Sequence, residues 1–411
     1  MPRSTLNIIG NKAVLNIRER MCETAEELLA SDKFRLVLDH CLNNLRSKNS
    51  PLLEFFGSCD ADEECVDHLV KTLSLLVKYE CSVVPHIFDK SKIFLSNTDK
   101  LTGFVEYLYD YWRHFDRFII NDSEGDRLDK RPYRTFNETI EQLTHLVRMV
   151  YRHIQENITG SHPSVYRQVP AGAEMAVISL PKDLAYKGEK YKRLNTVPVI
   201  RQMLIYPPLV IQQPMNKRTG HFKKIQQNPL DLIDLKAGEW LCYPAKVGKL
   251  LIMVYFHLDF YELGFSMCNL FQLADDSDLE KKPDALFIYG AQGNVIDGLA
   301  KFSTVFYDDE ENGIFVGAIP DRPEFGYFGY LKKMILTLHN SIVMKSGNMP
   351  FHGAMVKIML QGNKEATILM MGDTGAGKSE TLEAFRVLAE KHIRELTIIA
   401  DDMGSIELDS K

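Results

Sequence analysis

Long apolar runs are missing from this sequence. The longest strongly apolar stretch is residues 250–256, whereas a membrane-spanning helix needs about 20 such residues. The N-terminus carries no apolar segment of the kind found in signal peptides. An excess of positive charge is also missing, because the net charge is −6 and the pI is near 6.1. We therefore expect a cytoplasmic protein that binds neither nucleic acid nor membranes.

Paired cysteine motifs are missing as well. The seven cysteines include no C-x-x-C pair, and the closest two are Cys59 and Cys65. Their spacing does not match that of a zinc site. We expect reduced, mostly buried thiols of the type found in cytoplasmic proteins.

The first 160 residues predict a mainly helical module. Residues 7–17 predict two short strands around a turn, and helical periodicity follows up to about residue 160. Signals for helix N-termini lie at Thr24, Asp60 and Thr135. Thr24 and Thr135 each precede a glutamate by three residues, which is the capping-box pattern. We find no chemistry in this module, and its role as a partner-binding surface stays open.

Residues 161–325 predict a mixed, β-rich domain. Strand-like stretches are residues 175–180, 209–211, 250–258 and 285–289, and residues 304–307 and 313–317 predict a hairpin. Arg218 lies in a basic turn of this domain and is a candidate clamp for a substrate carboxylate. An ordinary surface loop is an equal alternative for this turn.

The clearest motif lies near the C-terminal end. Residues 372–379 fit the pattern G-x-x-x-x-G-K-[ST] of a phosphate-binding P-loop. An apolar run precedes the motif and a helical pattern beginning at Glu380 follows it. We expect the backbone N–H groups of the loop to bind a nucleotide phosphate. The residues concerned are Gly372, Asp373, Thr374, Gly375, Ala376, Gly377, Lys378, Ser379 and Glu380.

Two carboxylates follow the next strand. Residues 396–400 predict a buried strand, and Asp401 and Asp402 come directly after it. By analogy with other P-loop proteins, we expect Lys378 to contact the β- and γ-phosphates of the nucleotide and the hydroxyl of Ser379 to bind Mg²⁺. A strand-end aspartate is the usual second partner of that ion. Alone, the pair could belong to a helix cap or a turn, but the nearby P-loop motif favours a metal-binding role for at least one of the two.

The order of these motifs resembles two related families. Phe351-His352-Gly353, the P-loop ending in Lys-Ser-Glu-Thr, and Ala400-Asp401-Asp402 resemble the HPr kinase/phosphorylase catalytic core. Residues 327–333, which end in Lys332-Lys333, add a resemblance to phosphoenolpyruvate carboxykinase. The two families share one P-loop fold, and the resemblance covers roughly residues 325–402.

The resemblance implies a two-metal site. Lys333, as a neutral amine, His352 and Asp402 would bind a transition metal, usually Mn²⁺, while Asp401 would join Ser379 in the Mg²⁺ shell. The implied catalytic residues are Lys333, His352, Lys378, Asp401 and Asp402. The cofactors would be ATP or GTP with Mg²⁺ and Mn²⁺, and the substrate a small carboxylate.

Several residues depart from the carboxykinase pattern. Tyr330 replaces a glutamate, Ser379-Glu380 replaces Thr-Thr, and the connection from Lys378 to Asp401 is long. The chain stops nine residues after Asp402, so we expect a P-loop domain truncated at its C-terminus. The expected fold is α+β or α/β, with a helical module at 1–160, a mixed β-rich domain at 161–325 and a nucleotide-binding domain at 326–411.

Three functions fit this sequence. The first is an ATP-dependent lyase like phosphoenolpyruvate carboxykinase, a decarboxylase of gluconeogenesis that converts oxaloacetate to phosphoenolpyruvate. The second is an HPr-type kinase of a protein serine or a small-molecule hydroxyl. The third is an ATP-binding regulatory protein without turnover, whose residues 18–160 bind a partner.

Overall fold

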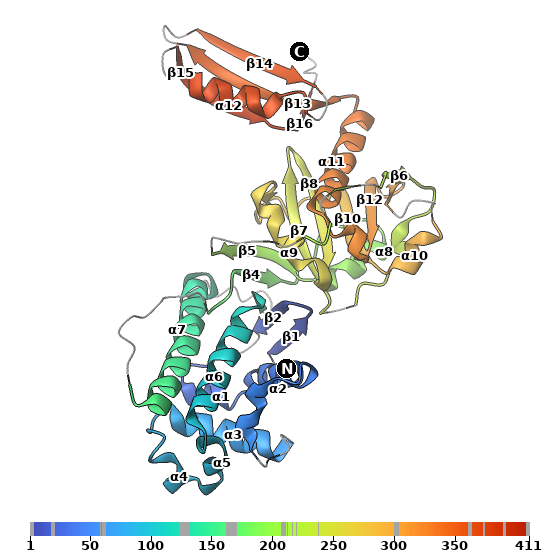
Figure 1. Cartoon of the computed structure of the whole chain (residues 1–411). Helices are drawn as coiled ribbons and strands as arrows, with labels where there is room; N and C mark the ends of the chain where they lie inside the picture. Colours follow the sequence, from blue (N-terminus) through green and yellow to red (C-terminus); the bar gives the residue numbers. More distant parts are fainter. Residues whose placement is uncertain are drawn as a thin grey trace. The chain divides into compact units, whose positions relative to one another are not determined.

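The chain forms a mixed α/β structure with two compact units (Figure 1). The computed structural model describes residues 4–17, 21–57, 59, 63–122, 131–161, 171–206, 211, 213–215, 217–218, 220–236, 238–299, 304–360, 364–372, 375–388 and 392–407. Unit 1 contains residues 1–180 and 200–210, and unit 2 contains residues 181–199 and 211–411. The predicted mixture of helix and sheet is confirmed, and the three-part division at residues 160 and 325 stays a prediction. None of the described helices is both long and apolar enough to span a bilayer.

Helices supply most of the core of unit 1. The Thr24 hydroxyl accepts a hydrogen bond from the Glu27 N–H at 3.2 Å, so the predicted cap is confirmed. Thr135 lies inside a helix that begins at Arg131, so the predicted start there is wrong, and Asp60 lies outside the described residues. The helices are α1 (Ala25–Leu29), α2 (Asp32–Ser47), η1 (Pro51–Phe56), α3 (Glu63–Leu76), α4 (Val84–Ile87), η2 (Asp89–Ser91), α5 (Lys92–Leu95), α6 (Thr98–Arg113) and α7 (Arg131–Thr159).

Unit 1 also contains a sheet. The predicted hairpin forms from β1 (Thr5–Ile9) and β2 (Lys12–Ile17). Strand β3 (Asp116–Asp122) pairs parallel with β2, and β4 (Met175–Leu180) pairs parallel with β3; β5 (Val199–Ile205) follows in the strand order. The helical prediction was wrong for β3, where Phe118, Ile119 and Ile120 are all buried. A continuous apolar run buried on both faces of a sheet has no strand periodicity to reveal it.

A buried arginine joins α6 to this sheet. Arg117 of β3 is only 3% exposed. Its guanidinium donates to the Gly172 carbonyl at 2.6 Å, to the Phe115 carbonyl at 2.8 Å and to the Glu174 carboxylate. Because these acceptors are themselves shielded from water, loss of the arginine would leave a buried charge and unpaired carbonyls.

We therefore expect Arg117→Met to destabilise unit 1 by about 3–5 kcal/mol, the cost of breaking a buried ion pair. Urea-induced unfolding of the full chain measures this loss. The control is Lys92→Ala, which removes an ion pair with Asp89 whose side chains are 65% and 80% exposed; it should lower the free energy of unfolding far less than Arg117→Met does, because water screens exposed ion pairs. Equal losses in the two variants would contradict the prediction.

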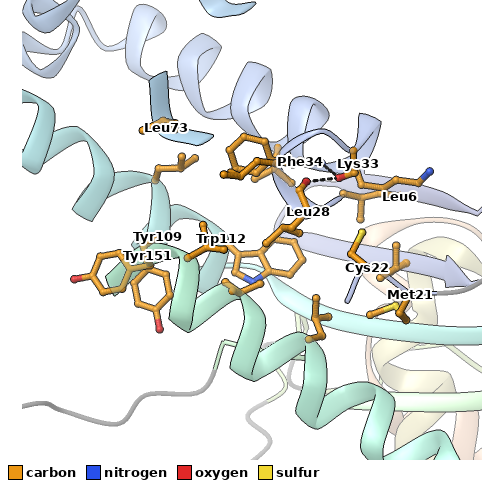
Figure 2. A pocket seen from close by; sticks show the side chains of 18 of the residues that line it. Leu6, Met21, Cys22, Leu28, Lys33, Phe34, Leu73, Tyr109, Trp112 and Tyr151 are labelled. Atoms are coloured by element: carbon orange, nitrogen blue, oxygen red, sulfur yellow. Dashed lines mark hydrogen bonds between the residues drawn. The ribbon is translucent and has the colours of Figure 1, made fainter. Parts of the chain in front are cut away.

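The core of unit 1 encloses a cavity (Figure 2). Its volume is about 240 Å³, and its walls come from β1, β2 and the helices α1, α2, α3, α6 and α7. Phe34, Trp112 and the stacked rings of Tyr109 and Tyr151, 4.0 Å apart, contribute aromatic surface. The wall is almost entirely apolar.

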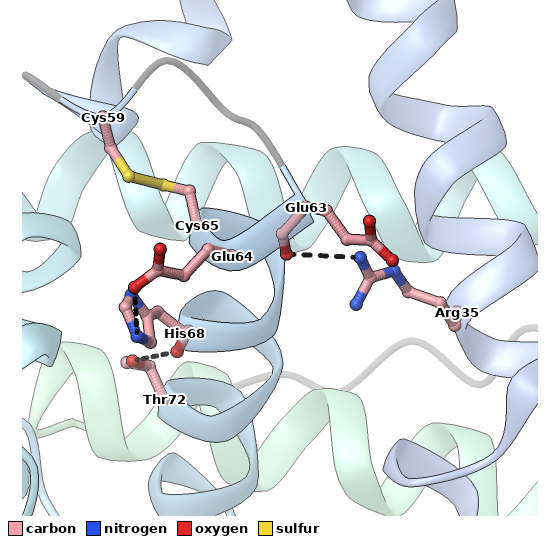
Figure 3. The surroundings of a disulfide bond; sticks show 7 residues. All are labelled: Arg35, Cys59, Glu63, Glu64, Cys65, His68 and Thr72. Carbon is pink, nitrogen blue, oxygen red and sulfur yellow. Dashed lines mark hydrogen bonds and ion pairs between the residues drawn. A yellow bond between two sulfur atoms is a disulfide. The ribbon is translucent and has the colours of Figure 1, made fainter.

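Two cysteines of unit 1 form a disulfide (Figure 3). Cys59 follows η1 and Cys65 lies in the first turn of α3, which places their Cα atoms 6.3 Å apart. The expectation of reduced thiols was therefore wrong for this pair. Outside this pair, Cys22, Cys41, Cys81, Cys242 and Cys268 form no disulfide, and two of them, Cys41 and Cys242, are buried.

Unit 2 is built on a mixed sheet with strand order β7-β8-β10-β12-β11-β6. Strands β8, β10 and β12 run parallel, so their carboxyl ends meet at one edge. The predicted hairpin is confirmed as β11 and β12, and residues 209 and 210 of the predicted strand at 209–211 lie outside the described residues. The strands are β6 (Lys223–Lys224), β7 (Trp240–Val247), β8 (Leu250–His257), β9 (Gln272–Leu273), β10 (Ala285–Ala291), β11 (Val305–Asp309) and β12 (Ile314–Pro320).

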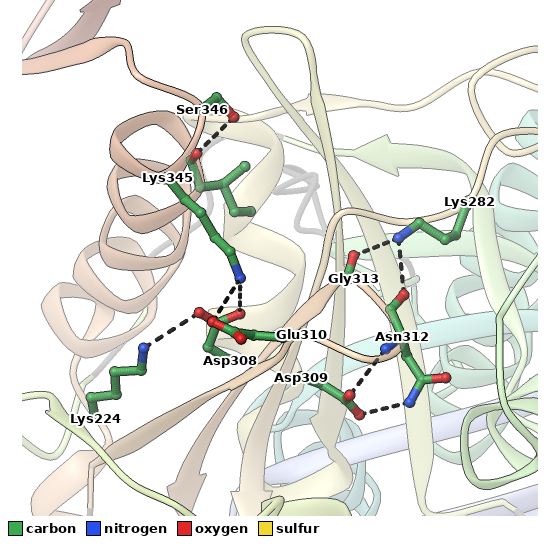
Figure 4. Close-up of polar contacts among 10 residues, drawn as sticks. Lys224, Lys282, Asp308, Asp309, Glu310, Asn312, Gly313, Lys345 and Ser346 are labelled. Carbon is green, nitrogen blue, oxygen red and sulfur yellow. Dashed lines mark hydrogen bonds and ion pairs between the residues drawn. The ribbon is translucent and has the colours of Figure 1, made fainter.

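The helices of unit 2 that precede β13 in the chain are short apart from α11. They are α8 (Glu189–Lys192), η3 (Arg193–Thr196), η4 (Pro229–Asp231), η5 (Leu258–Phe260), α9 (Tyr261–Ser266), η6 (Met267–Asn269), α10 (Gly293–Asp297), η7 (Pro323–Phe325) and α11 (Phe328–Lys345). The acidic turn of the hairpin holds the last turn of α11 (Figure 4). Lys345 donates to Asp308 at 2.7 Å, and Lys224 donates to the same carboxylate at 3.3 Å. These contacts fix the helix whose first turns carry Lys332 and Lys333.

Unit 2 contains a second sheet, and one of its strands leads into the P-loop motif (Figure 1). Strand β13 (Met349–Leu360) lies between β14 (Glu365–Met371) and β15 (Ile393–Ala400), antiparallel to both, and β16 (Met403–Ile406) pairs with its first residues. Its core forms where β13 packs against Leu382 of α12 (Lys378–Leu388). The prediction that β15 is buried was wrong, because Ile398 and Ile399 are 53% and 52% exposed. The strand exists, but the apolar run lies on a solvent-facing part of the sheet.

Candidate functional site

Three chain segments converge where β14 and β15 end. Both strands are antiparallel to β13 and therefore parallel to each other, so their carboxyl ends lie at the same edge. The register places Gly353 opposite Met371, the last residue of β14, and Met355 opposite Ala400, the last residue of β15. His352 of β13 consequently lies beside both the start of the P-loop motif and the Asp401-Asp402 pair.

Asp402 is the centre of this site. One carboxylate oxygen, Oδ1, lies 3.3 Å from Nε2 of His352. The other, Oδ2, lies 2.5 Å from Nζ of Lys332 and 3.6 Å from Nζ of Lys333, both on α11. The predicted set Lys333, His352 and Asp402 is thus brought together from a helix, a strand and the turn after another strand.

The charges around Asp402 favour its ionised form. Partial burial acts to raise the pKa of this carboxyl. Its contacts with Lys332, Lys333 and His352 act in the opposite direction, through hydrogen bonds and positive charge. They outweigh burial and lower the pKa of Asp402 to about 2. The backbone of Asp402 has a φ of +69°, which non-glycine residues rarely adopt. Its carbonyl accepts a hydrogen bond from the Gly353 N–H at 3.1 Å, which holds this turn against β13.

The described part of the P-loop motif lies next to His352. The Gly372 N–H donates to the His352 carbonyl at 3.2 Å, which joins the start of the loop to β13. Gly375 and Gly377 have φ values of +82° and +79°, a region that favours glycine. Lys378 is the first residue of α12, and its Nζ donates to the Gly372 carbonyl at 2.9 Å. Asp373 and Thr374 lie outside the described residues.

Gly353 lets the two strands approach at this point. A Cβ atom added there would lie 2.4 Å from the Met370 carbonyl oxygen of β14. We expect Gly353→Ala to lower the stability of unit 2 by about 1–3 kcal/mol, because backbone has to shift to relieve the overlap. Thermal unfolding of the full chain measures the change.

The matched control for this variant is Gly298→Ala, because an added Cβ at Gly298 meets no atom within 4 Å. It should unfold like the unchanged protein. Equal stability of Gly353→Ala and Gly298→Ala would mean that the Met370 carbonyl does not lie close enough to residue 353 to exclude a Cβ atom.

Other predicted site residues lie outside this cluster. Asp401 is exposed after β15, and Ser379 and Glu380 are exposed in the first turn of α12. Arg218 donates to the Gly220 carbonyl at 2.7 Å and lies 5.2 Å from the Phe222 ring centroid. None of these four side chains joins the Asp402 cluster within the residues that the structure describes.

Two residues, Lys332 and Tyr330, make contacts at or near this site that the sequence did not predict. Lys332 makes a shorter contact with Asp402 than Lys333 does, and the doubled lysine was the only signal for it. Tyr330 accepts a hydrogen bond from the Gly220 N–H at 2.9 Å. The loop that carries Arg218 is thereby fixed to the start of α11.

Comparison with known proteins adds no assignment. No protein-family model matches the chain, and no curated protein matches it significantly.

Proposed function

We propose that this protein catalyses nucleotide- and divalent-metal-dependent phosphoryl transfer, with a site related to those of phosphoenolpyruvate carboxykinase and HPr kinase. The observation that supports this is the convergence of Lys333, His352 and Asp402 beside Gly372. A metal-binding set next to a phosphate-binding loop is the arrangement that phosphoryl transfer requires, because the reaction depends on positioning and charge neutralisation.

The donor atoms of the cluster suit a transition metal. The imidazole nitrogen Nε2 of His352 lies 3.3 Å from Oδ1 of Asp402, and the amine nitrogen Nζ of Lys333 lies 3.6 Å from the other oxygen, Oδ2. Ligands about 2.0–2.2 Å from a shared ion have similar spacing. Lys333, His352 and Asp402 would hold Mn²⁺, which as a Lewis acid would stabilise the enolate left by decarboxylation. Lys333 has to be neutral to bind, and Lys332 then remains as the partner of Asp402.

The P-loop residues act on the nucleotide. The N–H groups of the loop and the N-terminus of α12 would bind the phosphates of ATP or GTP. Lys378 would leave the Gly372 carbonyl and neutralise the β- and γ-phosphates, while the Ser379 hydroxyl and Asp401 would hold Mg²⁺. Ser379 and Asp401 are exposed, so both are accessible to a bound nucleotide.

Oxaloacetate is the substrate we favour, with phosphoenolpyruvate, CO₂ and ADP as products. The Lys332-Lys333 pair favours this reaction, because it resembles a segment of phosphoenolpyruvate carboxykinase that the HPr kinase family lacks, and both side chains lie at Asp402. Arg218 is a candidate to bind a carboxylate of the substrate. The hydrogen bond between Gly220 and Tyr330 holds the loop of Arg218 near α11, the helix that carries Lys332 and Lys333.

An HPr-type kinase is the alternative, and it needs a general base for a hydroxyl. A carboxyl with a pKa of about 2 is a weak proton acceptor at neutral pH, which disfavours Asp402 in that role. Asp401 would be the base in this version. An ATP-binding protein without turnover, with residues 18–160 as its partner-binding part, is the third candidate.

Lys333→Ala distinguishes these functions. We expect the variant to lose Mn²⁺- and oxaloacetate-dependent ADP formation by about 10²–10³-fold, because it removes one of the three proposed ligands of the metal that stabilises the reacting centre. Lys378→Ala should lose activity to a similar degree through the nucleotide. A coupled assay of ADP release on the full chain measures both.

Lys364→Ala is the control, because Lys364 is in the connection between β13 and β14 and has an exposed side chain. It should retain full activity. Activity on a hydroxyl substrate that survives Lys333→Ala and disappears in Asp401→Ala would favour the kinase. Tight ATP binding without turnover of any substrate would favour the regulatory protein.

A further inference from the structure

A second cluster of potential metal ligands lies on the main sheet of unit 2. His257 is the last residue of β8, Asp259 follows it in η5, and Asp321 comes directly after β12. One ligand atom from each of the three lies within 4.8 Å of the others. Among the residues that the structure describes, this is the one group of histidine, cysteine and acidic side chains so arranged.

The position of the cluster in the sheet is typical of ligand sites. Strands β8, β10 and β12 are parallel neighbours, and in open α/β sheets ligands bind beyond the carboxyl ends of such strands. The central strand β10 makes room here. Gly290 has a φ of +100°, and a Cβ atom there would lie 2.7 Å from Cβ of His257. The Asp321 N–H donates to the Ala291 carbonyl at 2.6 Å, which fixes the third ligand to the same strand.

The histidine of this cluster is held from both sides. Its Nδ1 lies 3.3 Å from Oδ2 of Asp259, and its Nε2 lies 3.9 Å from Oε2 of Glu239. Glu239 precedes β7, whose pairing with β8 brings it alongside His257. A carboxylate behind the second ring nitrogen is the usual partner of a metal-bound histidine, because it orients the ring and fixes its tautomer.

The surroundings of the cluster favour positive charge. Besides the carboxylates of Asp259 and Asp321, the carboxylate of Glu239 also faces the His257 imidazole. The cation nearest in sequence, Arg322, is ion-paired with Asp297 and with Glu324.

We infer that His257, Asp259 and Asp321 form a binding site for a divalent transition metal, with Glu239 supporting His257 from behind. One imidazole and two carboxylates suit Zn²⁺, Co²⁺ or Mn²⁺ better than the softer Cu⁺, which prefers sulfur ligands. Asp259 has a side chain 39% exposed, so water can reach the ion and fill positions that the three protein ligands leave open. The ligand set shares no residue with Lys333, His352 and Asp402, so this site does not depend on the proposed function.

Titration of the chelator-treated full chain with Co²⁺ tests this inference, with visible absorption and equilibrium dialysis as readouts. In the Asp402→Asn background, which disables the P-loop-side metal set, we expect one Co²⁺ per chain. Adding Asp321→Asn or Asp259→Asn should remove that ion, and Glu239→Gln should weaken its binding about 10- to 100-fold, as loss of a second-shell partner does. Glu280→Gln, an exposed acid of the same unit, is the control and should change nothing.

The outcomes are distinct. If no Co²⁺ binds in the Asp402→Asn background, or if Asp321→Asn and Asp259→Asn both bind Co²⁺ as tightly as the Glu280→Gln control, the site is an imidazole–carboxylate ion pair and the inference is wrong. Far-UV circular dichroism identifies any variant that fails to fold, and Glu239→Gln, which keeps all three ligands, then decides the result. If Asp402→Asn itself removes no ion from the unchanged protein, the metal of the proposed function fails while this site stands.

Discussion

The carboxylate of Asp402 is the interaction on which the candidate site depends. It meets two ammonium groups from α11 and an imidazole from β13, while its own backbone follows β15 and hydrogen-bonds to Gly353. Without this carboxylate, no negative charge would separate the side chains of Lys332, Lys333 and His352, and the two lysines would repel each other. Its positive φ shows that the turn is held in an uncommon conformation, which the surrounding contacts stabilise.

The antiparallel strand β13 makes this convergence possible. It separates β14 from β15 and, through His352, reaches the start of the P-loop on one side and Asp402 on the other. Gly353 is essential to this geometry, because only a hydrogen atom fits against the Met370 carbonyl. The polar groups of the site therefore rest on the pairing of one sheet, and α11 adds its lysines from a helix anchored at Asp308.

Several elements of the fold could be predicted from local sequence patterns, and others could not. Capping at Thr24, the β11–β12 hairpin and the strands that flank the P-loop each have a signal within a few residues, and the structure contains them. The β3 strand was missed because its partners, β2 and β4, are distant in sequence. Exposure of Ile398 and Ile399 was missed because an apolar run does not reveal which of its faces other elements cover. The shorter contact of Lys332 depends on the rotation of α11 relative to Asp402, which spacing alone does not determine.

The most direct test of this account is the position of Mn²⁺ relative to a bound nucleotide. Crystals of the full chain grown with Mn²⁺ and a non-hydrolysable ATP analogue would locate the ion by its anomalous scattering. The account predicts an ion bound by Lys333, His352 and Asp402, with the nucleotide phosphates on the loop between Gly372 and Ser379. A nucleotide bound on this loop with no ion among those three side chains would contradict it.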